Sequence, residues 1–150
     1  MTNETRTVVR LTQQQDYSFD VSFGDGVPVL RCDEPPPLGQ GSGPSPEQLL
    51  AAAVGNCLSD SLLFALRKFK QRPEPLHTEV ATLVGRNPQG RMRVQGMEAT
   101  ITLGVAAATL EHLDRVLDSF EDYCTVTRSV AGAIDVKVRV VDALGAVLKP

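Results

Sequence analysis

The chain has 150 residues, of which 42% are hydrophobic, and this suits one globular domain over residues 1–150 with a sizeable core. A net charge of −3 without any basic block argues against nucleic acid and anionic membrane as partners. No apolar run reaches about 18 residues free of polar breaks, and the N-terminus lacks a secretory pattern, so we expect a cytoplasmic protein without a membrane-spanning helix.

The first third of the chain predicts a three-stranded meander. Residues 5–12 have the β-branched content of a strand, and the polar residues 13–16 are predicted to form a turn. Residues 17–23 alternate between apolar and polar side chains, as a half-buried strand does. A Gly-Asp-Gly turn at 24–26 then leads to a third strand at 27–32.

A loop rich in proline and glycine, residues 33–44, leads into the most apolar helix of the chain. Ser45 suits the N-cap, Pro46 suits the first helical position, and Gln48 is placed to complete a capping box. The helix is predicted to run to Lys70, with apolar residues on nearly every side. Such a helix is buried in a core, and the short strands before and after it offer too little sheet to cover it, so a partner chain is expected.

The remaining residues predict two more strands, two helices and a last strand. The strands are expected at 77–85, 92–103 and 134–141, a helix capped by Thr109 runs through Phe120, and a short helix occupies 125–131. The predicted order is βββ-α-ββ-αα-β, a mixed α+β fold with mostly antiparallel pairing.

Three cysteines, Cys32, Cys57 and Cys124, do not form a structural disulfide framework in a chain of this length. Neither histidine has metal-ligand spacing to a cysteine pair, so no metal or other cofactor is expected. The default interpretation of each thiol is a small buried hydrophobe. Cys57 and Cys124 both fall on apolar helix faces, however, and if their Cα atoms come within about 6 Å they could cycle between dithiol and disulfide. Spacing alone leaves both possibilities open.

Gly-Pro-Ser-Pro-Glu-Gln-Leu-Leu-Ala-Ala-Ala at residues 43–53, followed by Cys57 and much later by Cys124, resembles the OsmC/Ohr superfamily of osmotically inducible C-like and organic hydroperoxide resistance proteins. The resemblance implies an intertwined α+β homodimer, in which both central helices pack between two sheets and the active sites lie at the subunit interface. It also implies a thiol peroxidase of the oxidative stress response that acts on organic hydroperoxides.

The resemblance assigns a role to each of three residues. Cys57 would attack the peroxide and become a sulfenic acid, Cys124 would convert it into a disulfide, and an external dithiol of the lipoyl type would reduce that disulfide. Glu47 matches the glutamate that orients an arginine of the first hairpin in the family. In this chain residues 13–16 read Gln-Gln-Gln-Asp, and the nearest arginines are Arg10 and Arg31.

Two other function classes remain open. Peroxidase members usually have proline where this chain has Thr125, and together with the missing hairpin arginine this favours a non-catalytic binding module for a small hydrophobic ligand. A thiol redox sensor is a further alternative.

Glu47 and Cys57 are ten residues apart, about 15 Å along a helix, so either the helix breaks near Gly55 or Glu47 approaches Cys57 from a second subunit. In the alternative interpretation Glu47 has no catalytic role, and its negative charge in the first turn only stabilises the helix through the helix dipole.

Overall fold

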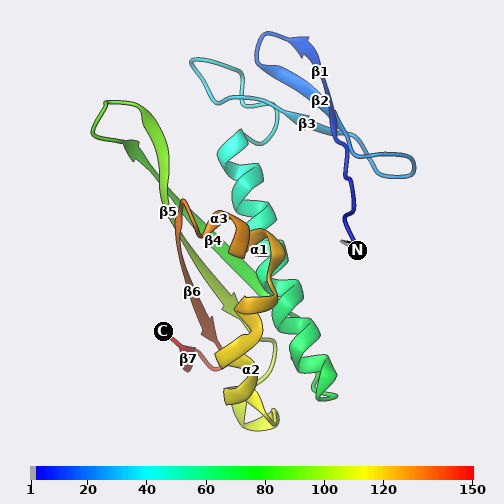
Figure 1. Ribbon diagram of the computed structural model, residues 1–150, viewed down its shortest axis with the longest axis vertical. Helices are drawn as coiled ribbons and strands as arrows, with labels where there is room; N and C mark the ends of the chain where they lie inside the picture. Colours follow the sequence, from blue (N-terminus) through cyan, green and yellow to red (C-terminus); the bar gives the residue numbers. More distant parts are fainter. Residues whose placement is uncertain (1–2) are drawn as a thin grey trace. The chain divides into compact units, whose positions relative to one another are not determined.

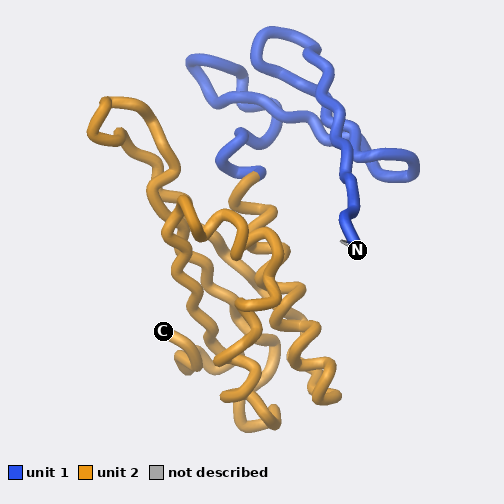
Figure 2. The backbone as a smooth tube through the Cα atoms, in the orientation of Figure 1, with its two compact units in different colours: residues 1–49 blue, residues 50–150 orange. Residues whose placement is uncertain are grey.

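The computed structural model describes residues 3–150, which form an α+β structure with two sheets, as predicted. The chain divides into two compact units, residues 1–49 and residues 50–150 (Figure 2). The first unit holds a three-stranded sheet and the second holds a four-stranded sheet with three helices.

The first unit contains the predicted meander, with strands β1 (Arg10–Gln15), β2 (Ser18–Ser22) and β3 (Leu30–Cys32) in antiparallel order. The limits of the first strand were predicted wrongly. Glutamines 13–15 belong to β1 and not to a turn, because the chain reverses only at Asp16, whose φ of 51° is one that aspartate tolerates. Pairing with β2 outweighs the weak strand preference of glutamine here.

The loop between β3 and the first helix is organised around one carboxylate. Asp33 is buried, and its oxygens accept the backbone N–H groups of Glu34, Gln40 and Ser42 at 2.8, 3.2 and 3.1 Å and the Ser42 hydroxyl at 2.8 Å. The backbone and side-chain bonds from Ser42, followed by the bond from Gln40, hold the pKa of Asp33 below its usual range. These bonds fix the conformation of the loop between β3 and α1.

Helix α1 (Pro46–Lys68) begins with the predicted capping box. Gln48 Oε1 accepts the Ser45 N–H at 2.9 Å, and Ser45 Oγ accepts the Gln48 N–H at 3.3 Å. The helix ends at Lys68, two residues before the predicted limit, because Lys70 turns left-handed with φ of 59°.

The second unit is built on a four-stranded sheet in the order β4 (His77–Arg86), β5 (Met92–Thr102), β6 (Asp135–Val141), β7 (Val147–Lys149). The pairs β4–β5 and β6–β7 are antiparallel, whereas β5 and β6 run parallel (Figure 1). Parallel strands require a crossover, and the helical segment between β5 and β6 supplies it. The prediction did not include β7.

That crossover contains η1 (Ala107–Thr109), α2 (Leu113–Ser119), η2 (Phe120–Tyr123) and α3 (Thr125–Val130). The prediction that Thr109 caps the first of these α-helices is wrong. Its hydroxyl donates to the Ala106 carbonyl at 2.7 Å within the 3-10 turn, and α2 starts after His112. Leu110 is extended and interrupts the helical pattern that the apolar spacing suggested.

The core of the second unit lies between the sheet and α1, with α2 and α3 beside α1 (Figure 1). It consists of fully or nearly fully buried apolar side chains: Val54, Leu58, Leu62, Leu66, Met97, Ala99, Ile101, Leu103, Val116, Leu117, Phe120, Cys124, Val138 and Val140. Gly55 lets α1 approach β4 closely, since a Cβ atom there would lie 2.9 Å from Val80 Cγ2.

Within residues 50–150, α1 buries one side only, and Ala52, Ala53 and Phe64 remain exposed. Among residues 3–150, α1 is the one helix whose length and mean hydropathy of 1.7 would suffice to cross a membrane. The core helix of a globular protein meets the same criterion, and the packing of α1 against the sheet is of that kind.

Candidate functional site

The structure brings Cys57 and Cys124 together. Cys57 lies in the middle of α1 and is half-buried, and Cys124 lies fully buried at the junction of η2 and α3. Both thiols are free, and they are close enough for the Cys57 side chain to hydrogen-bond that of Cys124. The structure therefore places a half-buried thiol beside an enclosed thiol.

The two sulfurs have different electrostatic surroundings. Burial raises the pKa of the Cys124 thiol above its usual range, and the hydrogen bond with the Cys57 side chain raises it further. Cys57 Sγ accepts the backbone N–H of Val126 at 3.4 Å, a donor that stabilises negative charge on sulfur. Burial outweighs the hydrogen bonds from Thr127 that favour the Cys124 thiolate, so the net shift of the Cys124 pKa is upward.

Glu47, the third predicted site residue, lies in the first turn of α1. The helix continues without a break from Pro46 to Lys68, so the alternative of a break near Gly55 is wrong. Ten residues of continuous helix place Glu47 about 15 Å from Cys57 along the axis. Within one chain these two residues are not brought together.

The two candidate arginines both belong to the meander. Arg31 lies on β3, where its Nε donates to Asp20 Oδ1 at 3.0 Å, and Arg10 is exposed at the start of β1.

Cys32, on the same strand as Arg31, is buried, and burial raises the pKa of its thiol. Among residues 3–150, no group of three His, Cys, Asp or Glu side chains is placed to hold a metal ion.

Sequence reasoning missed the Val126 donor. A backbone N–H carries no residue-type signature, and only the position of α3 beside α1 directs it at the sulfur. The start of a short helix directly after Cys124 was nevertheless predicted, and a helix start is where unpaired N–H groups are expected.

Fold and site together define a class of α+β proteins in which a long central helix carries one thiol beside a second, enclosed thiol. The family model for OsmC-like protein matches residues 39–139, and the chain belongs to this family. No curated protein sequence matches the chain.

Three solved structures illustrate the similarity. An OsmC-like protein of unknown function from Vibrio cholerae superposes with a TM-score of 0.77 at 17% identity, covering 92% of this chain and 100% of the other. An organic hydroperoxide resistance protein from Elizabethkingia anophelis, crystallised with thiocyanate bound, gives 0.73 at 19% identity over 93% and 98%. OhrB of Bacillus subtilis, also an organic hydroperoxide resistance protein, gives 0.70 at 17% identity over 91% and 98%. At these identities the similarity establishes the fold.

Proposed function

We propose that this protein is a cysteine-dependent peroxidase that reduces organic hydroperoxides. The observation that carries the proposal is the pair of free thiols, in which half-buried Cys57 lies beside fully buried Cys124. Membership of the OsmC-like family and similarity to proteins named for organic hydroperoxide resistance support this function.

The proposed reaction has two balanced steps. The Cys57 thiolate attacks the distal oxygen of ROOH, the O–O bond breaks, and the alkoxide leaves as ROH after taking up a proton, so that Cys57 becomes a sulfenic acid. The Cys124 sulfur then attacks the Cys57 sulfur, which releases water and forms the disulfide. An external dithiol, lipoyl-type in our proposal, returns both residues to thiols.

The environments support this division of roles. A thiol whose pKa is raised by burial is a poor nucleophile towards a peroxide, and this applies to Cys124. Cys57 is accessible and accepts the Val126 N–H, which suits the attacking sulfur.

We further propose a homodimer in which Glu47 of one subunit acts at the Cys57 site of the other. Ten residues of unbroken helix keep Glu47 from Cys57 in its own chain, so a catalytic contact requires a second copy. Arg10 or Arg31 is then the cation that Glu47 would orient. The protein would work in the cytoplasm, where thiols are kept reduced.

The test is a steady-state assay with cumene hydroperoxide and dihydrolipoamide. We expect turnover by the wild type and none by Cys57→Ser. Cys32→Ser is the matched control, because Cys32 is a buried thiol on β3 outside the pair, and it should retain activity. Equal turnover by the wild type and Cys57→Ser would overturn the proposal.

A non-catalytic binding module is the second candidate. It is favoured by the sequence, because residues 13–16 read Gln-Gln-Gln-Asp at the hairpin where the family has an arginine. Mass spectrometry after one equivalent of hydroperoxide separates the two candidates. The peroxidase loses two hydrogens as the disulfide forms, whereas the binding module keeps its mass.

A further inference from the structure

The hydroxyl of Thr127 lacks the partner that a buried polar group normally has. Thr127 lies on α3 and is 3% exposed, and its Oγ1 makes no hydrogen bond to any nitrogen or oxygen atom of residues 3–150. Ser129, two residues further along the same helix, instead donates to the Thr125 carbonyl at 2.7 Å. Because an enclosed hydroxyl without a partner destabilises the folded state, its presence in the core needs a reason.

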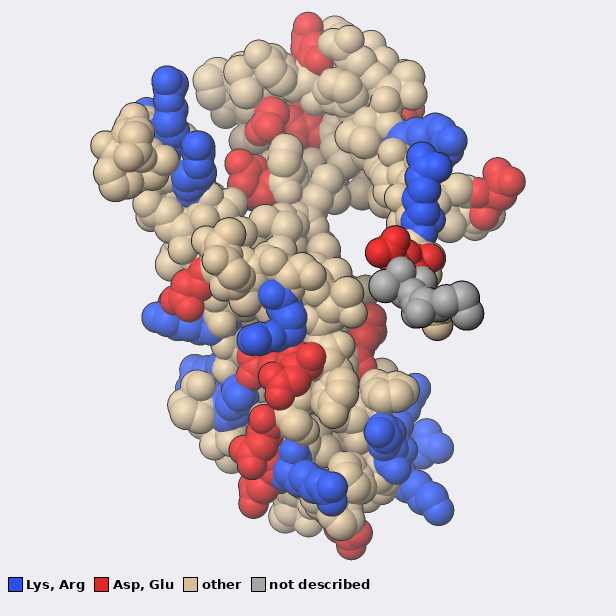
Figure 3. Space-filling model, in the orientation of Figure 1, with Lys and Arg blue, Asp and Glu red and all other residues tan. Residues whose placement is uncertain are grey.

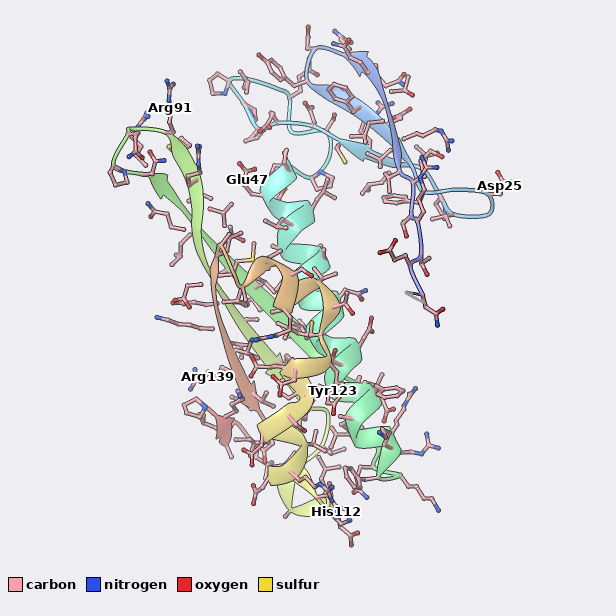
Figure 4. All side chains as sticks on the ribbon, in the orientation of Figure 1. Asp25, Glu47, Arg91, His112, Tyr123 and Arg139 are labelled. Carbon is pink, nitrogen blue, oxygen red and sulfur yellow. The ribbon has the colours of Figure 1, made fainter. Side chains whose placement is uncertain are left out.

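The Cys124 sulfur is the group that this hydroxyl can address. Cys124 is the N-cap residue of α3 and Thr127 is the third residue of that helix, the two positions that face each other in a capping box. Both residues are buried. Figure 4 labels Tyr123, which directly precedes Cys124, at the end of η2 beside α1. The first turn of α3 therefore encloses the Cys124 sulfur together with the Thr127 hydroxyl.

Thr127 opposes the effect of burial on Cys124. Burial raises the pKa of the Cys124 thiol, and the Cys57 side chain raises it further, whereas the hydroxyl and the N–H of Thr127 lower it. A hydroxyl that donates a hydrogen bond to sulfur stabilises the thiolate relative to the thiol. Among the groups of the described chain that shift the pKa of Cys124, Thr127 is thus the residue that favours the anion.

No charged side chain of residues 3–150 stabilises a Cys124 thiolate in place of Thr127. On η2, Glu121 pairs with Lys149 at 2.6 Å and Asp122 is exposed. On α3, Arg128 is exposed, and charged side chains over this part of the second unit lie on the surface in Figure 3. The charge that does affect the pKa of Cys124 is that of Cys57, and it disfavours the thiolate.

The same helical turn also serves the other sulfur. The Val126 N–H donates to Cys57 Sγ at 3.4 Å, and Val126 directly precedes Thr127. Consecutive residues of α3 therefore provide donors for the two sulfurs that must meet when the disulfide forms.

We propose that Thr127 is a positioning residue for disulfide formation, whose hydroxyl donates to the Cys124 thiolate and keeps that sulfur directed at Cys57. In this step the Cys124 thiolate forms the S–S bond, the S–O bond of the Cys57 sulfenic acid breaks, and the departing hydroxide takes up a proton to become water. Thr127 keeps its own proton throughout. That the disulfide forms in a peroxidase cycle rests on the proposed function, whereas the hydrogen bond to the thiolate does not.

The first test measures the pKa of Cys124 without any turnover. In protein that carries Cys32→Ser and Cys57→Ser, Cys124 is the one cysteine left, and the NMR shift of its isotope-labelled Cβ is followed against pH. Thr127→Val keeps the shape of the side chain and removes the hydroxyl, so the pKa of Cys124 should rise by about one pH unit. Thr127→Ala removes the same hydroxyl and should give the same rise, whereas Thr127→Ser should keep the pKa of the parent protein. Thr125→Val, at an exposed position on the same helix, is the matched control and should leave the pKa unchanged.

The second test separates the two chemical steps. Wild-type protein and the Thr127 variants, each with all three cysteines, are mixed with one equivalent of cumene hydroperoxide, and acid-quenched samples are analysed by mass spectrometry. We expect Thr127→Val to form the Cys57 sulfenic acid at the wild-type rate but the disulfide about tenfold more slowly at pH 7, because a higher pKa leaves less Cys124 thiolate. Thr127→Ser should form the disulfide at nearly the wild-type rate, since serine retains the hydroxyl.

The two tests separate failure of the inference from failure of the proposed function. An unchanged Cys124 pKa in Thr127→Val, or a disulfide rate that Thr127→Ser does not recover, would overturn the role of Thr127 even if hydroperoxides are turned over. Equal slowing of both steps would indicate a merely structural role and would overturn it as well. A protein that consumes no hydroperoxide, but whose Cys124 pKa rises in Thr127→Val, would refute the peroxidase and support the hydrogen bond to the thiolate.

Discussion

Cys57 and Cys124 show how two residues of one type acquire different chemistry from their positions. Cys124 is enclosed by the core at the junction of η2 and α3, while Cys57 lies on α1 with part of its surface exposed and a backbone N–H directed at its sulfur. In the proposed reaction, the exposed Cys57 sulfur reacts with the peroxide first, and the buried Cys124 remains a thiol until the second step.

Replacing Cys124 should separate the two chemical steps. In Cys124→Ser, Cys57 should still react with one equivalent of cumene hydroperoxide, but the sulfenic acid should persist because no second thiol adjoins it. Dimedone labelling followed by peptide mass spectrometry should locate the adduct on Cys57. An adduct on Cys32, or no adduct, would contradict the assigned roles.

The raised pKa of Cys124 predicts a pH-dependent second step. Because the attack on the sulfenic acid needs the thiolate, disulfide formation should accelerate by about tenfold per pH unit below the Cys124 pKa. Acid-quenched samples taken at several pH values from 6 to 9 and analysed by mass spectrometry give this rate directly. A rate independent of pH over this range would show that Cys124 is not the titrating group.

At the scale of elements, α1 is held against the sheet by a close approach at one glycine. Gly55 allows the helix to approach β4, where Ser59 Oγ lies 2.6 Å from Thr78 Oγ1. A larger side chain at this position has no room, because the nearest atom belongs to Val80 in the packed interface.

Gly55→Val should therefore lower the free energy of unfolding by about 1–3 kcal/mol. Asn56→Val is the matched control, since Asn56 is the next residue on α1 and is exposed, and it should change stability by less than about 0.5 kcal/mol. Urea unfolding followed by circular dichroism measures both. If the two variants lose equal stability, helix propensity and not the close approach is responsible.

Asp142 connects the β6–β7 turn to η1. Its carboxylate accepts the N–H groups of Ala107, Leu144 and Ala146 at 2.9, 3.0 and 2.9 Å. These backbone bonds, the one from Ala107 foremost, hold the pKa of Asp142 below its usual range.

The sign of the resulting pH dependence follows from the lowered pKa. Asp142 has a lower pKa in the folded state than in the unfolded state. The Asp142 carboxylate therefore stabilises the fold fully above its unfolded pKa, and this stabilisation is lost as the pH falls through its folded pKa. Asp142→Asn should be less stable than the wild type at pH 7, and the difference should shrink at acid pH. Thermal unfolding between pH 3 and 7 tests this, and a constant difference would contradict it.

At the scale of the whole molecule, the first unit has too little core for its apolar surface. Among residues 3–49 two apolar side chains are buried, Val21 and Cys32, whereas several large ones are exposed. The exposed ones are Val8, Val9, Leu11, Tyr17, Phe23, Val27, Val29 and Leu38. A three-stranded sheet with this exposure requires a covering surface, and a second copy of the chain supplies one in the proposed dimer.

We predict that the protein has no stable folded monomer. Leu11 is an exposed apolar side chain of the sheet that we propose the partner covers, so Leu11→Asp should weaken association by at least about 3 kcal/mol by burying an unpaired carboxylate. Ser22→Asp, an exposed position opposite Arg10 on the neighbouring strand, is the control and should leave association unchanged. Sedimentation equilibrium at micromolar concentration gives the molecular mass, and a well-folded wild-type monomer would refute both the dimer and the two-chain site.

The sequence by itself determined what depends on local chemistry. The Ser45–Gln48 capping box predicted where α1 begins, and alternation of apolar residues predicted most strands, since both signals act over a few neighbouring positions. The motif at residues 43–53 with Cys57 predicted the family, and the family model confirms it. The short strand β7 and the interruption at Leu110 were missed, because three-residue strands and 3-10 turns leave little periodicity to detect.

Only the tertiary structure decided the geometry of the site. The adjacency of Cys57 and Cys124 and the Val126 donor both join segments far apart in the chain. Spacing in a sequence does not define distances across a core, because those distances depend on how the parallel β5–β6 crossover returns α2 and α3 to α1. The unbroken course of α1 was likewise decided by packing, which tolerates Gly55 within the helix because it allows close contact with β4.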